Sequence, residues 1–226
     1  MRIGILQTGH APEPVQDELG EYSDMFERLL AGRGFSFARY DVVDMEFPDS
    51  VRAADGWLIT GSKHGAYEDL PFIAPLEAFI REAYAAHVPI VGICFGHQVI
   101  AQALGGKVEK FAGGWAVGPT TYRMGERELS LNAWHQDQVT ELPEGAQVIG
   151  GNDFCRNAAL AYDDRILSVQ PHPEFTARMM QLLIEQRGRG VVPDDLLDSA
   201  LTKLEAPSDS AALAEQIGAF FNKPRG

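Results

Sequence analysis

The stretch VPIVGICFGHQVI, from Val88 to Ile100, decides the fold because it joins a buried strand to a helix. The short apolar run after Pro89 predicts a strand, and from Gly96 onward the apolar positions follow helical spacing. Cys94 lies at the junction between the two. Gly92 and Gly96, two residues before and two after it, are typical of a nucleophile elbow, a tight turn in which a Cβ would clash with the backbone.

An elbow here places Cys94 at the N-terminus of the following helix. Unpaired backbone N–H groups and the positive end of the helix dipole stabilise a thiolate at such a position. A lone cysteine is more often a buried structural residue, but flanking glycines at a strand-to-helix junction favour a nucleophile. A thiolate that attacks an acyl group also needs a proton donor for the leaving group, and a residue that orients this donor.

A second apolar run, over 166–170, leads directly to His172, and Glu174 follows two residues later. Both side chains can project from one strand end toward Cys94, so we predict a catalytic set of Cys94, His172 and Glu174. The two motifs, GICFGHQ around Cys94 and QPHPE around His172, closely resemble those of the class I glutamine amidotransferases. The resemblance runs from Met1 to about residue 185, and the motifs follow each other in the family's order.

The resemblance implies that two backbone N–H groups form an oxyanion hole, one from Gly61 and one from Phe95. Gly61 follows a strand predicted over 54–60, and Phe95 is the residue after the nucleophile. The family commonly has two glycines where this chain has Gly61 and Ser62, and the first of them is kept. A plain loop at Gly61 is the alternative.

The resemblance also implies substrate contacts. In the family, the glutamine one turn after the nucleophile, here Gln98, hydrogen-bonds the substrate. A Ser/Asn-His-Gly segment that binds the α-carboxylate and α-amino groups of glutamine corresponds to Trp134, His135 and Gln136. As in the amidotransferase domain of guanosine monophosphate synthetase, this chain has His135 and Asp137, but Trp134 and Gln136 replace small residues. The indole either forms a wall for a larger γ-glutamyl substrate or fills the core.

Two other residues carry side chains of catalytic type without a catalytic setting. His97 lies inside the helix after the elbow and is expected to point away from the thiol. Cys155 has neither an elbow nor a following helix, so we predict a structural thiol there.

Composition indicates a globular protein, since 45% of the 226 residues are hydrophobic and 23% are charged. No apolar run reaches the roughly 18 residues of a membrane helix, and residues 1–6 lead into a strand rather than resembling a signal peptide. Two cysteines are too few for a disulfide framework, and a catalytic thiol favours a reducing compartment, so we expect a cytoplasmic protein. The net charge of −13 argues against nucleic acid or an anionic membrane as partner, but not against a zwitterionic substrate.

Strand and helix signals alternate in the first half of the chain, with a Gly/Pro/acidic loop after the first strand. The sequence predicts strands over 2–7, 35–42 and 54–60 and helices over 20–32 and 71–86, then a β-rich part with strands over 117–124, 128–132, 147–150 and 158–161. We expect an α/β fold, a flavodoxin-like three-layer sandwich whose central, mostly parallel sheet has helices on both faces, with a small added β region. Ligands bind such sheets at the carboxyl ends of the strands.

The tail of the chain lies outside the resemblance. We divide the sequence into an amidotransferase-like domain over 1–185 and a C-terminal helical extension over 186–226. A helix opens near residue 194 with acidic residues in its first turn, and a last helix begins near Ser210 with apolar residues on one face. We expect both to pack on the main domain; a surface for another subunit is the alternative.

The expected chemistry is acyl transfer through a cysteine thioester, which needs no metal and no organic cofactor. In the family, ammonia from glutamine passes to a synthetase domain, and this sequence has no P-loop and no second domain. Three functions remain open. The chain is a glutaminase that feeds a separate synthetase subunit, an autonomous hydrolase of γ-glutamyl compounds similar to the plant γ-glutamyl peptidases, or a non-catalytic binding module. An intact Cys94, His172 and Glu174 disfavours the last.

Overall fold

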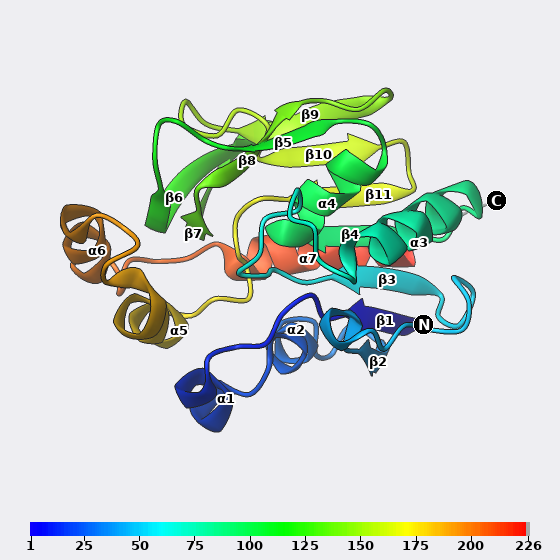
Figure 1. Cartoon of the computed structure of the whole chain (residues 1–226), viewed down its shortest axis with the longest axis horizontal. Coiled ribbons are helices and arrows are strands. Elements are labelled where there is room, and N and C mark those ends of the chain that lie inside the picture. The colour runs from blue at the N-terminus through cyan, green and yellow to red at the C-terminus, as the bar shows by residue number, and fades with distance from the viewer. Residues whose placement is uncertain (225–226) are drawn as a thin grey trace.

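A nine-stranded sheet forms the centre of the computed structural model, which describes residues 1–224 (Figure 1). Its strands are β1 (Arg2–Leu6), β2 (Ser36–Tyr40), β3 (Gly56–Ile59), β4 (Ile90–Ile93), β6 (Ala116–Met124), β7 (Arg127–His135), β9 (Ala146–Gly151), β10 (Ala159–Tyr162) and β11 (Ile166–Val169). They are ordered β2-β1-β3-β4-β11-β10-β9-β6-β7. The first five are parallel neighbours and the remaining pairs are antiparallel, so only β10 and β6 run against the others.

Helices cover both faces of the parallel half. Side chains alternate across each strand, so Trp57 and Ile90 point into one apolar cluster, together with residues of α3 (Ile73–Ala85) and α4 (Phe95–Ala103). Their neighbours Leu58 and Val91 point into a second cluster, against α2 (Tyr22–Leu29) and α7 (Ser210–Asn222). The predicted α/β fold, with a mostly parallel sheet between two layers of helices, is confirmed.

The C-terminal helices pack at two places. Leu213, Ile217 and Phe221 of α7 are buried in the second cluster, under the central strands. α6 (Asp194–Leu201) lies against β6, where Leu197 and Ala200 are buried beside Trp115 and Trp134. Between β11 and α6 the chain forms α5 (Ala177–Leu183) and a π-helical turn, η2 (Ile184–Gly188). No helix within residues 1–224 is long and apolar enough to cross a membrane.

Three local features differ from the sequence-based expectations. The loop expected after the first strand contains α1 (Glu13–Leu19), which buries only Val15 and so lacks an apolar period. The short polar strands β5 (Lys107–Lys110) and β8 (Asp137–Glu141) form a separate two-stranded sheet. Neither strand was predicted, because neither shows an alternation of apolar and polar residues. The strand predicted over 128–132 continues to His135, so Trp134 and His135 of the expected binding segment lie at the end of β7 and Gln136 follows it.

Candidate active site

Cys94 occupies a strained turn between β4 and α4. Its backbone has φ 52° and ψ −103°, a conformation that L residues adopt only where the surroundings impose it. A Cβ on Gly92 would lie 2.6 Å from the carbonyl oxygen of Gly96, and a Cβ on Gly96 would lie 2.3 Å from that of Ile59. Only glycine fits at either position, so the backbone has the geometry expected of a nucleophile elbow.

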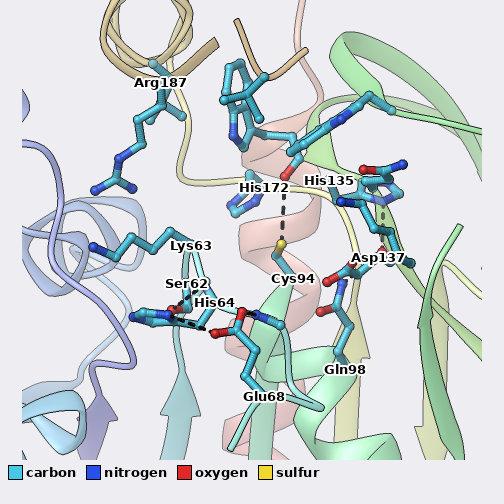
Figure 2. A pocket seen from close by; sticks show the side chains of 18 of the residues that line it. Ser62, Lys63, His64, Glu68, Cys94, Gln98, His135, Asp137, His172 and Arg187 are labelled. Carbon is cyan, nitrogen blue, oxygen red and sulfur yellow. Dashed lines mark hydrogen bonds and ion pairs between the residues drawn. The ribbon is translucent and has the colours of Figure 1, made fainter. Parts of the chain in front are cut away.

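The thiol of Cys94 opens onto a cavity of about 500 Å³ at the carboxyl ends of the strands (Figure 2). Cys94 is 6% exposed, and its Sγ lies 4.0 Å from the carbonyl oxygen of Trp134 at the end of β7. Its own carbonyl accepts the first hydrogen bond of α4, from the N–H of Gln98 at 3.0 Å. The sulfur therefore sits at the positive end of a helix, beside the cavity.

His172 follows β11 and reaches the same cavity. Its Nδ1 lies 2.7 Å from Oε1 of Glu174, and its ring stacks on Phe175 with 3.9 Å between centroids. Its backbone N–H donates to the carbonyl of Asn132 in β7, at 2.8 Å. With Nδ1 turned to the carboxylate, Nε2 is the nitrogen left for a reacting group.

The charges around His172 favour its protonated form. Burial lowers the pKa of the imidazole, but the charge of Glu174 and the interactions with Glu174 and Cys94 outweigh burial and raise this pKa to about 10. His172 is thus a cation at neutral pH, next to the sulfur that it would have to serve as acid and base.

Gly61, at the turn after β3, lies against both of these residues. A Cβ there would be 2.9 Å from Cε1 of His172 and 3.7 Å from Cβ of Cys94. The hydroxyls of Thr8 and Thr60 donate to the Gly61 carbonyl at 3.1 and 3.0 Å and so fix the turn. Within residues 1–224, neither the Gly61 nor the Phe95 N–H group donates a hydrogen bond, so both are available to an oxyanion.

The predicted substrate residues all line the cavity, held by contacts of their own. Gln98 donates from Nε2 to the Asp137 carbonyl, at 2.9 Å, and to Gln170, at 3.1 Å. His135 lies 3.2 Å from the Asp137 carbonyl through Nδ1, and burial lowers its pKa to about 3, so this imidazole is neutral. Gln136 donates to the carbonyl of Phe111 at 3.4 Å.

Trp134 lies both on the cavity and in the core. Its indole meets that of Trp115 edge to face, with 6.3 Å between centroids, and its far edge lies near Gly188. The indole therefore contributes to the lining of the cavity and also packs against the core.

His97 and Cys155 stay away from the cavity lining. Nδ1 of His97 pairs with the hydroxyl of Ser168 at 2.9 Å, and burial lowers the pKa of this imidazole to about 3. The thiol of Cys155 is buried, and burial raises its pKa to about 12.

Sequence reasoning missed several residues of the cavity, among them Tyr22 and Arg187. Tyr22 stacks on Phe175 at 6.2 Å, and Arg187 donates to the Tyr22 hydroxyl at 3.4 Å and to the carbonyl of His10 at 3.0 Å. In the sequence, Tyr22 was interpreted only as an apolar position of the helix predicted over 20–32. Arg187 belongs to a polar run whose π-helical turn no pattern marks, although such turns are frequent at functional sites.

Metal ligands are not grouped in this part of the chain. In the ranges that the structure describes, no three or more His, Cys, Asp or Glu side chains are arranged to hold a metal ion. What the arrangement supports is acyl chemistry, in which a nucleophile, an oriented acid–base residue and two free N–H donors meet around one cavity.

Comparison with known proteins agrees with the two motifs. The model of the family "glutamine amidotransferase class-I" matches residues 18–188. γ-Glutamyl peptidase 4 of Arabidopsis thaliana is 33% identical over 74% of this chain and 73% of its own length. One subunit of the glutamine-hydrolysing GMP synthase of Halobacterium salinarum is 31% identical over 71% of this chain and 87% of its own. A solved glutamine amidotransferase structure from Methylobacillus flagellatus shares the fold, with a TM-score of 0.74 at 23% identity, covering 100% of this chain and 96% of the other.

Proposed function

This chain belongs to the class I glutamine amidotransferase family, and we propose that it hydrolyses γ-glutamyl amide bonds through a thioester on Cys94. Glutamine is the simplest such substrate. One observation carries the proposal: the strained Cys94 shares a cavity with His172, whose Nδ1 is held by Glu174 at 2.7 Å.

The proposed reaction has two halves. The Cys94 thiolate attacks the γ-carbonyl carbon, and the N–H groups of Gly61 and Phe95 stabilise the negative oxygen that forms. Protonated His172 then gives its proton to the departing nitrogen, the C–N bond breaks, and a γ-glutamyl thioester remains on Cys94. Neutral His172 next takes a proton from water, whose oxygen attacks the thioester, so glutamate leaves and the thiolate returns. Glu174 acts as a positioning residue, since it orients His172 and stabilises its positive charge.

Incubation of the purified protein with glutamine tests this proposal directly. Equimolar glutamate and ammonia should appear, and Cys94→Ser should release neither while keeping the melting temperature of the wild type. Equal turnover by wild type and Cys94→Ser would exclude the thioester.

Two biological roles are compatible with this proposal: ammonia supply to a separate synthetase subunit, and autonomous hydrolysis of γ-glutamyl compounds. The similarity to a GMP synthase subunit supports ammonia transfer to a separate synthetase subunit. The similarity to γ-glutamyl peptidases supports autonomous hydrolysis, and so does the cavity of about 500 Å³, which is lined by the indole of Trp134 and by Gln136. A reducing compartment such as the cytoplasm suits either, because the chemistry needs a free thiol.

The double change Trp134→Ser with Gln136→Gly tests the second alternative, autonomous hydrolysis of a larger γ-glutamyl substrate. If these side chains shape the cavity for a larger γ-glutamyl substrate, the ratio of kcat/KM should move toward glutamine by about tenfold, measured against a γ-glutamyl dipeptide. Equal losses on both substrates would mean that the two residues only hold the end of β7.

A further inference from the structure

Three cations, Arg187, Lys63 and Lys110, line the Cys94 cavity, and within residues 1–224 none of them forms an ion pair with Asp or Glu. The charge of Lys110 acts on Asp137, on the opposite side of the thiol from Arg187 and Lys63 (Figure 2). Arg39, Arg178 and Arg189, in contrast, pair with carboxylates. Unpaired positive charge in a concave site attracts an anionic ligand.

Arg187 is held in place by neutral groups. Nη1 donates to the Tyr22 hydroxyl at 3.4 Å, and Nη2 donates to the carbonyl of His10 at 3.0 Å. A guanidinium has five N–H donors in a rigid fork, so several remain free after these two bonds. The side chain is half-buried, which strengthens its interaction with any charge that enters the cavity.

Lys63 lies on the same side of the cavity as Arg187 (Figure 2). Burial lowers the pKa of His64, and the positive charges of Lys63 and Arg187 lower it further, against the opposing charge of Glu68. Both cations thus act on the same imidazole at the rim, and Figure 2 shows their side chains on the same side of Cys94.

This side is the one on which His172 lies. Arg187 contacts Tyr22, Tyr22 stacks on Phe175, and Phe175 stacks on His172, so a continuous series of contacts fixes the guanidinium relative to the imidazole. His135 and Asp137 lie on the opposite side of the thiol (Figure 2).

The position of His172, the general acid, determines which half of the substrate lies near Arg187 and Lys63. His172 must reach the departing nitrogen, so the leaving group occupies the side of His172, and the γ-glutamyl half occupies the side of His135 and Asp137. Ammonia, the leaving group of glutamine, has no group that could use a cation. An amino acid or peptide released from a γ-glutamyl compound carries a carboxylate that could.

We propose that Arg187 and Lys63 form a subsite for the carboxylate of the leaving group, so that the preferred substrates are γ-glutamyl amino acids or peptides with a free carboxylate. The inference rests on the proposed acyl transfer at Cys94. Arg187 supplies a fork that matches a carboxylate, and Lys63 supplies a second positive charge from the loop that follows β3.

The test compares two substrates that differ in one charge, γ-glutamylglycine and γ-glutamylglycinamide. For the wild type, kcat/KM should be about tenfold or more higher for the acid, since hydrogen bonds to a charged group are among the stronger ones. Arg187→Gln should bring this ratio close to one, and Lys63→Gln should lower it by a smaller factor. Arg189→Gln is the matched control, because Arg189 lies two residues away and is paired with Asp194 and Asp198, and it should leave the ratio unchanged.

Binding to the Cys94→Ser protein, measured by titration calorimetry with the same two compounds, separates this subsite from the proposed reaction. If the wild type turns over neither compound but Cys94→Ser binds the acid more tightly, and Arg187→Gln removes the difference, the subsite stands and the reaction falls. Equal kcat/KM for acid and amide in the wild type would overturn the subsite and leave the reaction. A preference for the acid that persists in both Arg187→Gln and Lys63→Gln would also overturn the subsite. Lys63 is exposed, so Lys63→Gln should fold and can still be measured if Arg187→Gln does not fold.

Discussion

The two cysteines of this chain lie in the same apolar cluster, yet their surroundings have little in common. Cys94 is 6% exposed and Cys155 is 1% exposed, so burial alone hardly separates them. Cys94 has a left-handed backbone at a strand-to-helix turn and opens onto a cavity. Cys155 lies in the connection between β9 and β10, where its N–H donates to the side chain of Asn152 at 2.7 Å and burial raises the pKa of its thiol to about 12.

Reactivity in this chain therefore comes from the backbone around the sulfur. At the Cys94 elbow, two glycines let β4 turn sharply into α4, which aims the thiol at the cavity and at the positive end of the helix. At Cys155 the neighbouring backbone closes on itself, since Asn152 donates its N–H to the Cys155 carbonyl at 3.0 Å. Nothing there presents the sulfur to a substrate.

The largest effect on activity should come from replacing the two cysteines one at a time. We expect Cys94→Ser to lower kcat on glutamine or γ-glutamylglycine by about 10⁴-fold or more, because it removes the nucleophile of a residue set that acts as a unit. Cys155→Ala should change kcat by less than about twofold and cost about 1–2 kcal/mol of the free energy of unfolding. Steady-state kinetics and urea unfolding measure the two quantities. A Cys155→Ala protein that folds but has lost activity would erase the distinction between the thiols.

The next effect concerns His172 and Glu174, which serve Cys94 and have no counterpart at Cys155. His172→Ala should lower kcat by about 10²- to 10⁴-fold, and Glu174→Ala by no more than that. The double variant should lose little beyond His172→Ala alone, because Glu174 acts through the imidazole. Losses that add as free energies would show that the two residues do separate work.

Each cysteine also has a tightly packed glycine nearby, and this allows a matched pair of substitutions. A Cβ on Gly96 would lie 2.3 Å from the carbonyl oxygen of Ile59, and a Cβ on Gly151 would lie 2.2 Å from that of Arg156. Both Gly96→Ala and Gly151→Ala should cost about 1–3 kcal/mol of the free energy of unfolding. Only Gly96→Ala should also lower kcat of the folded fraction, by about a hundredfold, since it shifts the thiol. Equal effects of the two on kcat would contradict the elbow.

The elbow could be predicted because its signal is local. Glycines at fixed spacing around Cys94, between an apolar run and a helical pattern, require one kind of turn. The same holds for His172 and Glu174, which follow an apolar strand directly. The parallel half of the sheet was equally accessible, since its strands are apolar and alternate with amphipathic helices.

Other elements carry no such local signal. β5 and β8 are short and polar, and their pairing depends on a partner about thirty residues away in the chain. α1 is held by a single buried side chain, Val15. Arg187 enters the cavity because a π-helical turn sets its direction and Tyr22, far away in the sequence, meets it.

The smallest of these effects is a shift in the pH dependence of kcat/KM. The pKa of His172 is raised to about 10, so kcat/KM should fall as pH rises through that value, because only protonated His172 can give a proton to the leaving group. Glu174→Gln removes a charge that raises this pKa and should move the fall to lower pH. An unmoved profile would mean that another group titrates. Cys155, with a pKa of about 12, should stay protonated throughout.

The raised pKa of His172 also determines how the stability of the fold changes with pH. A pKa that is higher in the folded protein than the usual 6.5 means that the interactions of protonated His172 stabilise the fold fully below about pH 6.5. This contribution is lost as pH rises through about 10. The free energy of unfolding should decline across that window in the wild type, and His172→Ala should flatten the decline.

The central claim is that Cys94 carries the acyl group and Cys155 does not. Acid quenching during turnover of γ-glutamylglycine, followed by proteolysis and mass spectrometry, measures this directly. We predict a γ-glutamyl thioester on the peptide that contains Cys94, absent from the Cys94→Ser protein and absent from the Cys155 peptide. A γ-glutamyl adduct on Cys155, or turnover without any adduct on Cys94 under conditions that trap thioesters, would contradict the account.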